Sequence, residues 1–353
     1  MSILYFSDKG WLISHADLIN TFYTSITTST GLTNFKIKQG LFQITFPFKN
    51  TNTSKKKRKR KQGAVVDDHL LKDIDHIKTI YKDFKLEFVH LLTAVRNDYE
   101  DFNKCALDLS AQVYEDSGIA QISNIIGGNK DEAKFLLINN SKFLFPSNCR
   151  FFCKDIVELN DYLINEKYDC ILLDPPWWNK YIRRKKAKTN FAYTMMFNAD
   201  IKMLPIDKLL ADSGLVVVWC TNSQQHLKAL ELEFFPEWNV QYVAKLFWLK
   251  ITNYGQPVCK FSDPPGKQPF EQILIGIRKN SAKSLSSLNG KLIVSVPSAL
   301  HSHKPPLTEL LAPYLPDNPK CLEIFARYLQ PNWTSWGSEV LRFQNECLYE
   351  ADT

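Results

Sequence analysis

Four consecutive residues near the middle of the chain combine a carboxylate, two rigid backbone carbonyls and an aromatic ring. They are Asp174-Pro175-Pro176-Trp177, and they directly follow the apolar run 170–173, which is typical of a buried parallel strand. The prolines fix φ and have no N–H to donate, so their carbonyls and the aspartate present hydrogen-bond acceptors together. The tryptophan offers a flat face on which a planar heterocycle can stack. The motif is therefore suited to receive the N–H groups of a heterocycle.

An exocyclic amine of a purine or pyrimidine fits this set of acceptors. Such an amine is a poor nucleophile because its lone pair is delocalised into the ring. Hydrogen bonds from its two N–H groups to Asp174 and to the Pro175 carbonyl favour a pyramidal nitrogen, which frees the lone pair in the transition state. Methyl transfer from a sulfonium donor then depends mainly on in-line placement.

A simple turn after a strand explains the same four residues without any chemistry, since Asp and Pro are common in turns. The chain contains a second such sequence, Asp263-Pro264-Pro265-Gly266. The preceding strand and Trp177 distinguish the first motif from the second.

The elements that must position the motif are short β-rich runs that alternate with helical stretches after about residue 142. The runs are 151–153, 170–173, 215–220, 240–249, 272–277, 292–296 and 321–325, with helices expected at 205–210, 223–235 and 306–314. This alternation predicts a doubly wound α/β sheet with helices on both faces, whose ligands lie outside the carboxyl ends of the strands. The motif at 174 would lie at that edge.

A smaller, mainly helical N-terminal unit is expected over residues 1–141, before the larger α/β domain at 142–353. Alternating apolar residues between 35 and 48 predict a β-hairpin, and a polar, basic linker follows at 50–66. Apolar residues then recur every three or four positions between 67 and 116, which predicts about two amphipathic helices.

The composition is that of a globular protein, and its positive charge is local. The 353 residues are 44% apolar and 23% charged, which excludes a chain that is disordered throughout, a collagen or a coiled coil. The formal net charge of +7 is accounted for by the seven Lys and Arg residues of 55–61, which we interpret as a nuclear import signal in preference to an RNA contact. We expect the nucleus, with the cytoplasm as a second location. No run approaches the roughly 20 apolar residues of a membrane helix, and the N-terminus lacks the pattern of a secretory signal, so no membrane is expected.

The cysteines and histidines do not predict a metal site. The eight cysteines form no CxxC pair, so they are expected to be reduced thiols. His301 and His303 are not accompanied by a cysteine or carboxylate cluster, and we expect them to be hydrogen-bonding residues.

The sequence resembles the DPPW-type adenine-N6 methyltransferases over nearly its whole length. The resemblance is carried by residues 173–177, 248–253, 291–297, 301–306 and 329–337, and extends to 10–12 and 18–20 near the N-terminus. It implies a Rossmann-like, permuted S-adenosylmethionine-dependent methyltransferase sheet, because the catalytic motif precedes the cofactor segment. The glycine-rich loop of other methyltransferases is absent, as in the family.

The resemblance also implies which residues bind S-adenosylmethionine. The adenine would contact Asp155 and Ile156, the methionine carboxylate Lys304, and the methionine ammonium Asp174. A C-terminal element would complete the cofactor site, with matches at Glu323, Phe325, Arg327, Ser338 and Glu339. Ser338 stands where the family has asparagine, so one ribose contact would be shortened or made through water.

Residues near the motif are candidates for nucleic-acid binding, each with a structural alternative. The basic stretch after the motif could grip phosphates while Tyr193 lines the base pocket, or could be a solvated loop. Trp248, Lys250 and Asn253 could form a second gripping loop, or be a core tryptophan with surface neighbours. The basic residues in question are Lys180, Arg183, Arg184, Lys185 and Lys186.

The resemblance implies N6-methylation of adenine in nucleic acid, with 2′-O-methyladenosine of spliceosomal small nuclear RNA as the first expected substrate and DNA as the second. Single-stranded RNA presents the base without the cost of flipping it out of a duplex. A non-catalytic nucleic-acid-binding subunit is the contrasting class, although the intact Asp174 and Lys304 favour an enzyme. Methylation of a protein glutamine is less favoured, since such sites carry Asn and Tyr in place of Asp174 and Trp177. An obligatory partner subunit is not expected.

Overall fold

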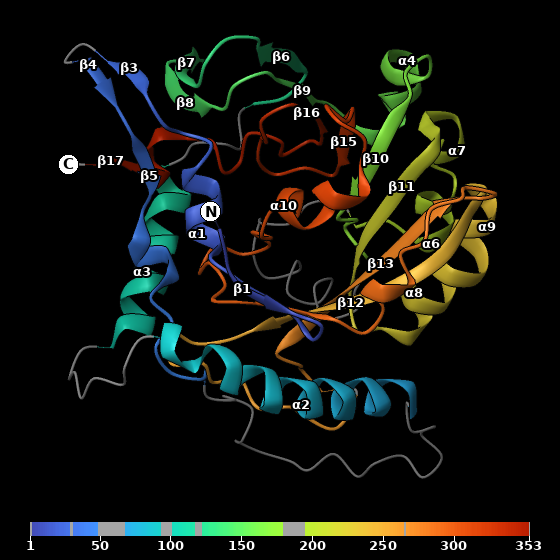
Figure 1. Cartoon of the computed structure of the whole chain (residues 1–353). Coiled ribbons are helices and arrows are strands. Elements are labelled where there is room, and N and C mark those ends of the chain that lie inside the picture. The colour runs from blue at the N-terminus through green and yellow to red at the C-terminus, as the bar shows by residue number, and fades with distance from the viewer. Residues whose placement is uncertain are drawn as a thin grey trace.

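The computed structural model describes residues 2–28, 31–48, 68–92, 101–116, 122–178, 195–264 and 266–352 (Figure 1). Its centre is an eleven-stranded sheet. In spatial order the strands are β1 (Ile3–Ser7), β2 (Gly10–Ile13), β14 (Leu292–Ser295), β12 (Val240–Lys250), β13 (Phe270–Arg278), β11 (Leu210–Cys220), β10 (Tyr168–Leu173), β15 (Cys321–Ile324), β16 (Trp333–Trp336), β9 (Cys149–Cys153) and β6 (Ile125–Asn129).

The sheet is mostly parallel. Strands β11, β10, β15, β16 and β9 pair in parallel, as do β12, β14 and β2. Strand β13 lies between these two groups and is antiparallel to both β11 and β12, and the edge strands β1 and β6 are also antiparallel to their neighbours. All seven β-rich runs of the sequence are strands of this sheet. The predicted mixed α/β fold is therefore confirmed.

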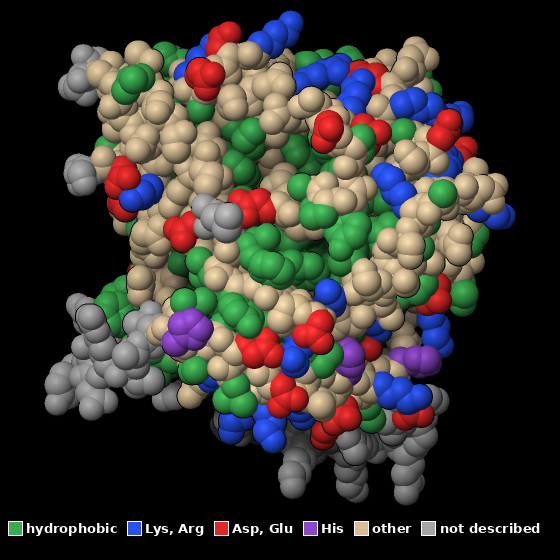
Figure 2. Space-filling view, viewed as in Figure 1, with side chains coloured by type: hydrophobic (Ala, Val, Ile, Leu, Met, Phe, Trp, Pro, Cys, Tyr) green, Lys and Arg blue, Asp and Glu red, His purple; other side chains and the backbone are tan. Residues whose placement is uncertain are grey.

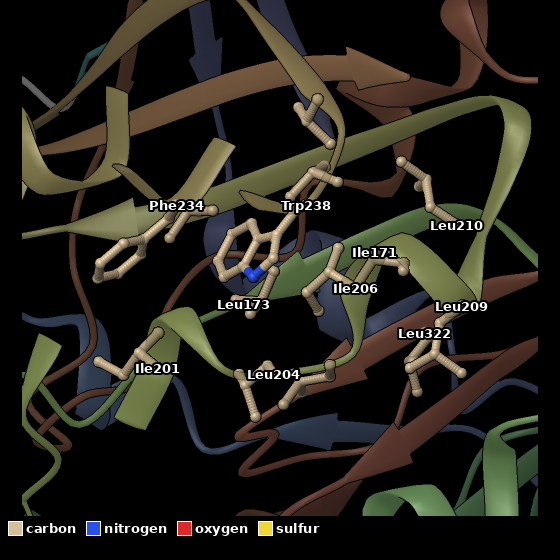
Figure 3. Close-up of a cluster of buried hydrophobic side chains, with 14 of the residues drawn as sticks. Ile171, Leu173, Ile201, Leu204, Ile206, Leu209, Leu210, Phe234, Trp238 and Leu322 are labelled. Atoms are coloured by element: carbon tan, nitrogen blue, oxygen red, sulfur yellow. The ribbon is translucent and has the colours of Figure 1, made fainter. Parts of the chain in front are cut away.

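Side chains of the central strands alternate between two apolar layers, as a sheet covered on both sides requires. Ile171 and Leu173 of β10 face a cluster that includes residues of α4 (Leu159–Leu163), α6 (Asn198–Lys202), α7 (Ile206–Leu209), α8 (Gln224–Ala229) and α9 (Phe235–Glu237). Cys170 and Leu172 face the opposite layer, which includes α10 (Thr308–Leu311). Figure 3 shows the first layer, where Trp238 and Phe234 lie near Ile171 and Leu173.

Two longer helices come from the N-terminal part of the chain. They are α2 (Asp68–Phe88) and α3 (Phe102–Asp116), which confirms the prediction of two amphipathic helices between 67 and 116. Helix α2 packs Ile77 and Phe84 against Phe247 and Leu249 of β12. Its outer side carries Lys intermingled with Asp and Glu, as the lower edge of Figure 2 shows.

The predicted hairpin at 35–48 is wrong. Strand β5 (Phe35–Ile37) pairs with β17 (Tyr349–Ala351) near the other end of the chain, and a 3₁₀ turn at Gln39–Phe42 follows it. The apolar alternation indicated a half-buried strand, but local periodicity does not specify the partner. The remaining small sheets are β3 (Ile26–Thr28) with β4 (Gly31–Thr33), and β7 (Lys134–Ile138) with β8 (Ser141–Phe145).

The N-terminal strands β1 and β2 belong to the main sheet, because β2 pairs in parallel with β14. The boundary predicted near residue 142 thus does not coincide with a break in this sheet. Helix α1 (His15–Asn20) follows β2 and packs in a separate cluster with Tyr349. None of the helices in the described residues is long and apolar enough to span a bilayer.

Candidate active site

The candidate site lies where several parallel strands end at one edge of the sheet. The last residues of the strands are in register, with Leu173 opposite Ile324, Ile324 opposite Trp336, and Trp336 opposite Phe152. The residues that follow these strands therefore meet at the same edge. This places the Asp174 motif beside Phe325 and Gly337, which come from more than 140 positions further along the chain.

Backbone hydrogen bonds fix the Asp-Pro-Pro-Trp motif in place. The Asp174 N–H donates to the Ile324 carbonyl at 3.3 Å, the Trp177 N–H to the Pro175 carbonyl at 2.8 Å, and the Met196 N–H to the Pro176 carbonyl at 2.9 Å. The sequence predicted that both proline carbonyls would be free to accept from a ligand. In the structure, each of them already accepts one backbone hydrogen bond. A carbonyl oxygen has two lone pairs, so Pro175 can still accept a second hydrogen bond.

Asp174 lies between two cations. Its Oδ2 is 3.1 Å from Arg327 Nη1, and its Oδ1 is 3.6 Å from Lys304 Nζ. The Asp174 and Lys304 side chains are each 13% exposed. These contacts orient the carboxylate and leave lone pairs on both oxygens for a ligand.

Glu271 is a site residue that the sequence analysis missed. Its two carboxylate oxygens pair with Lys250 and Lys304, so it joins the Asp174 cluster through Lys304. Burial acts to raise the pKa of Glu271, but Lys250 and Lys304 outweigh it and hold the pKa well below the ordinary value. Glu271 reaches this edge because β13 is antiparallel to β11 and therefore begins where β11 ends. An acidic residue near the start of a largely apolar strand was the available signal.

A first pocket opens on one side of the motif, with about 750 Å³ of empty space that includes open solvent. Its walls include most of the predicted cofactor residues, namely Asp155, Ile156, Phe325, Arg327, Ser338 and Glu339, together with Pro176. Phe325 has a φ of 67°, which is unusual for a bulky residue and turns the chain at the end of β15. The Asp155 carboxylate accepts from the Val157 N–H at 3.1 Å, and Glu339 pairs with Arg327 at 3.2 Å.

A second pocket lies on the other side of the motif. Asp174, Pro175, Lys250, Glu271 and Lys304 line it. Arg327 lines both pockets, and Pro175 and Pro176 line one each. The motif therefore forms part of the wall between two adjoining spaces, which is the arrangement that a transfer between two ligands requires.

Three predicted site residues are almost entirely buried. Trp177 lines the second pocket but is only 5% exposed, because its ring packs with His226 and Phe234 and its Nε1 donates to the Trp219 carbonyl. Little of that ring is open to a stacking base, which corrects the predicted role. Trp248 is 2% exposed and donates to Ser295 Oγ at 2.8 Å, so it is a core residue rather than part of a gripping loop.

Glu323 is also buried, and it lines neither pocket. It accepts a hydrogen bond from Gln330 Nε2 at 2.8 Å. Lys250 does reach the second pocket, whereas Asn253 is not among its lining residues and its N–H donates to the Ile44 carbonyl. The predicted residues Lys180, Arg183, Arg184, Lys185, Lys186 and Tyr193 lie outside the described residues.

Burial of Glu323 should make the stability of the protein depend on pH. Burial raises its pKa to about 8 from an ordinary 4.5, and the negative charge of Asp174 adds to the rise. The folded state therefore binds this proton more tightly, and the stabilisation is lost as the pH rises from 4.5 through 8. We expect Glu323→Gln to match the wild-type thermal midpoint at pH 5 and to exceed it at pH 9. If the difference in thermal midpoint between the two proteins stayed constant from pH 5 to pH 9, the raised pKa of Glu323 would be contradicted.

Gly337 should be essential for the first pocket. A Cβ atom at this position would lie 2.5 Å from the Ala326 carbonyl oxygen, a backbone atom that cannot move aside. The Gly337 N–H also donates to Phe152 at 3.0 Å, which ties β16 to β9 at the pocket floor. We expect Gly337→Ala to weaken binding of S-adenosylmethionine, the cofactor that the sequence resemblance implies, about tenfold or more by displacing the Phe325 turn. Calorimetric titration with S-adenosylmethionine measures this, and unchanged affinity would remove Gly337 from the site.

The residues that the structure describes contain no group of three or more His, Cys, Asp or Glu side chains that could hold a metal ion. The eight cysteines are free thiols in the structure. His303 is buried against Phe343 and Tyr328, which makes it a core side chain.

The fold and the paired pockets define an α/β domain with two adjoining pockets at the carboxyl edge of its sheet, which is where open α/β sheets bind their ligands. Residues 168–339, from the start of β10 to Glu339, match the MT-A70 protein-family model. The chain is 38% identical over 256 residues to the N(6)-adenine-specific methyltransferase METTL4 of Mus musculus, covering 70% of this chain and 50% of that protein. Residues 168–339 therefore belong to the MT-A70 family, which confirms the resemblance found in the sequence.

Other relatives carry more specific names. The N6-methyladenosine RNA methyltransferase MTA1 of Pyricularia oryzae is 36% identical over 213 residues, covering 58% of this chain and 55% of its own. The DNA N6-methyl methyltransferase of Caenorhabditis elegans is 32% identical over 218 residues, covering 60% of this chain and 58% of that protein. The chain spans about half the length of the METTL4 proteins it matches.

Proposed function

We propose that this protein transfers the methyl group of S-adenosylmethionine to the N6 amine of adenine in nucleic acid, and that 2′-O-methyladenosine in a single-stranded RNA, such as a spliceosomal small nuclear RNA, is its main substrate. The observation that carries the proposal is the position of Asp174. It lines the second pocket, two residues before Pro176 of the first pocket, and it lies between two cations. Family membership and the names of the relatives support the same chemistry.

The chemistry of the two pockets fits the cofactor. Apolar Ile156 and Phe325 suit the faces of an adenine, and the Asp155 carboxylate suits its amine. Asp174 provides acceptors for the methionine ammonium, and Lys304 provides a cation for the methionine carboxylate. When bound, S-adenosylmethionine supplies an electrophilic methyl group on a sulfonium sulfur.

The residues of the second pocket would hold the target amine. Asp174 and the remaining lone pair of the Pro175 carbonyl accept its two N–H groups, which favours a pyramidal nitrogen. Arg327 and Lys304 hold the Asp174 carboxylate in a fixed orientation through their ion pairs. Glu271 balances Lys250 and Lys304, so that neither cation draws Asp174 away from the amine. We propose that the chain acts without an obligatory partner subunit.

DNA is the second candidate substrate, favoured by the name of the Caenorhabditis elegans relative. The deciding experiment uses the purified chain, labelled S-adenosylmethionine, and matched RNA and DNA oligomers with one adenine, including a 2′-O-methyladenosine version of the RNA. We expect the highest kcat/KM for the 2′-O-methylated RNA. Transfer to DNA alone would replace the RNA assignment, and binding of oligomers without transfer to any of them would indicate a non-catalytic subunit.

The basic run at 55–61 lies outside the described residues, and we propose that it directs the protein to the nucleus. Deleting it should shift a fluorescent fusion from nucleus to cytoplasm and leave methyl transfer in vitro unchanged. An unchanged distribution, or a loss of RNA affinity in vitro, would favour the RNA-contact interpretation.

A further inference from the structure

Two aromatic residues beside the motif form a stacked pair that is open to solvent. Trp178 and Phe197 have ring centroids 6.1 Å apart and an interplanar angle of 20°. Phe197 is 60% exposed, although Trp178 covers part of one face of its ring. The opposite face is therefore available to a planar group, in the offset geometry that aromatic rings prefer.

The backbone holds this pair rigidly. The Trp178 N–H donates to the Met196 carbonyl at 3.1 Å, and the Met196 N–H donates to Pro176, so the chain segments before and after residues 179–194 are bridged directly. His226 adds a second link. Its Nδ1 lies 2.7 Å from Asn198 Oδ1 and its Nε2 lies 3.3 Å from the Trp178 carbonyl. A preorganised aromatic surface binds a ligand at a lower entropic cost than a mobile one.

The pair lies next to both pockets. Pro176 and Met196 line the first pocket, and Trp177 lines the second. Phe197 therefore follows directly on Met196 of the first pocket, and Trp178 follows directly on Trp177 of the second pocket. In the sequence, residues 179–194 between them contain six Lys and Arg residues and no Asp or Glu. This charge complements a phosphate backbone better than it complements an apolar protein surface.

We propose that Phe197, supported by Trp178, is a stacking surface for the nucleobase adjacent to the target adenine in a single-stranded nucleic acid. The inference rests on the proposed function and adds a subsite to it. Stacking of a base on an aromatic side chain is tolerant of sequence, since every base has a flat face. The subsite would therefore give affinity and hold the strand in register, while the second pocket receives the adenine.

The test measures binding of the full-length chain to fluorescent single-stranded RNA and DNA oligomers that contain one adenine. Phe197→Leu keeps an apolar side chain but removes the flat ring, and Phe197→Trp restores a ring. We expect Phe197→Leu to raise the dissociation constant about tenfold and Phe197→Trp to leave it within about twofold. Met203→Ala is the matched control, because Met203 is an apolar side chain, 75% exposed, at the end of α6. It should leave the dissociation constant unchanged.

Oligomers with an abasic site on either side of the adenine identify the stacked base. Wild-type protein should lose about tenfold in affinity for one of the two abasic oligomers, and Phe197→Leu should cause no further loss on that oligomer. The proposal would be overturned if Phe197→Leu reduced the affinity for intact and abasic oligomers equally, or if it reduced the affinity for neither. Methyl transfer by the wild-type chain to the intact oligomer tests the proposed function separately. If the protein binds the oligomers but transfers no methyl group, the abasic comparison still tests the stacking subsite.

Discussion

The Asp174→Asn variant is expected to bind S-adenosylmethionine weakly and to transfer methyl groups at least about 10²–10³-fold more slowly than the wild type. The asparagine keeps the size of the side chain but replaces one acceptor oxygen by a donor NH₂ group, which faces the N–H of the target amine. It also leaves Arg327 without the carboxylate that is 3.1 Å away. Single-turnover transfer of labelled methyl groups to an adenine-containing oligomer measures the effect.

Asp263 provides a matched control, because it begins the second Asp-Pro-Pro sequence and is exposed. Asp263→Asn should transfer methyl groups at the wild-type rate. Near-normal turnover by a folded Asp174→Asn protein, judged by an unchanged thermal midpoint within a few degrees, would remove Asp174 from the reaction.

Replacing Glu271 by glutamine should have the second largest effect, on both activity and stability. The cluster contains three cations, Lys250, Lys304 and Arg327, which pair with the carboxylates of Asp174, Glu271 and Glu339. Without Glu271, Lys304 loses its closer partner and should move onto Asp174, which reduces the capacity of that carboxylate to accept the amine. We expect kcat/KM to fall about 10–10²-fold, and the free energy of unfolding to fall by about 2 kcal/mol, which is less than for a fully buried pair because a quarter of the Glu271 side chain is exposed.

The pH dependence gives an independent check on Glu271. Because its pKa is depressed in the folded state, its stabilising contribution is present above the ordinary glutamate pKa and is lost as the pH falls towards the folded value. The wild type should therefore lose stability more steeply than Glu271→Gln below about pH 5.

The control for the activity measurement is Asp73→Asn. Asp73 lies on α2 and pairs with Lys245 of β12, so its replacement should leave kcat/KM unchanged. Equal activity of the Glu271→Gln and wild-type proteins would contradict the proposed charge balance.

The sequence predicted the parts of the fold that depend on local pattern. Apolar β-branched runs such as 215–220 become strands because both faces of the sheet are covered, and α2 forms because its apolar residues follow the helical period. Strand β5 shows the limit of such patterns. Its residues indicate an extended segment, but its partner β17 lies about 310 residues away, and only the tertiary fold determines that pairing.

The candidate site shows the same division. The motif, Lys304 and the first-pocket residues Asp155 and Phe325 were predicted by type and resemblance, and the structure brings them to one edge. Glu271 was missed because its role depends on the antiparallel direction of β13, which no local sequence feature reveals. The orientation of Trp177 was also beyond prediction. An aromatic ring beside a reactive carboxylate can face a ligand or the core, and the hydrogen bond to Trp219 directs this ring to the core.

The position of β15 in the sheet has a consequence for biosynthesis. This strand occurs late in the chain, yet it lies between β10 and β16 and pairs with both. During translation, β10 emerges about 150 residues before the strand that covers its second edge. Until then an apolar strand keeps a row of unpaired backbone groups, which can pair wrongly with other chains. We expect ribosome-bound chains that end before residue 321 to recruit chaperones and to resist proteases poorly, and to gain protease resistance once residues beyond 336 have emerged.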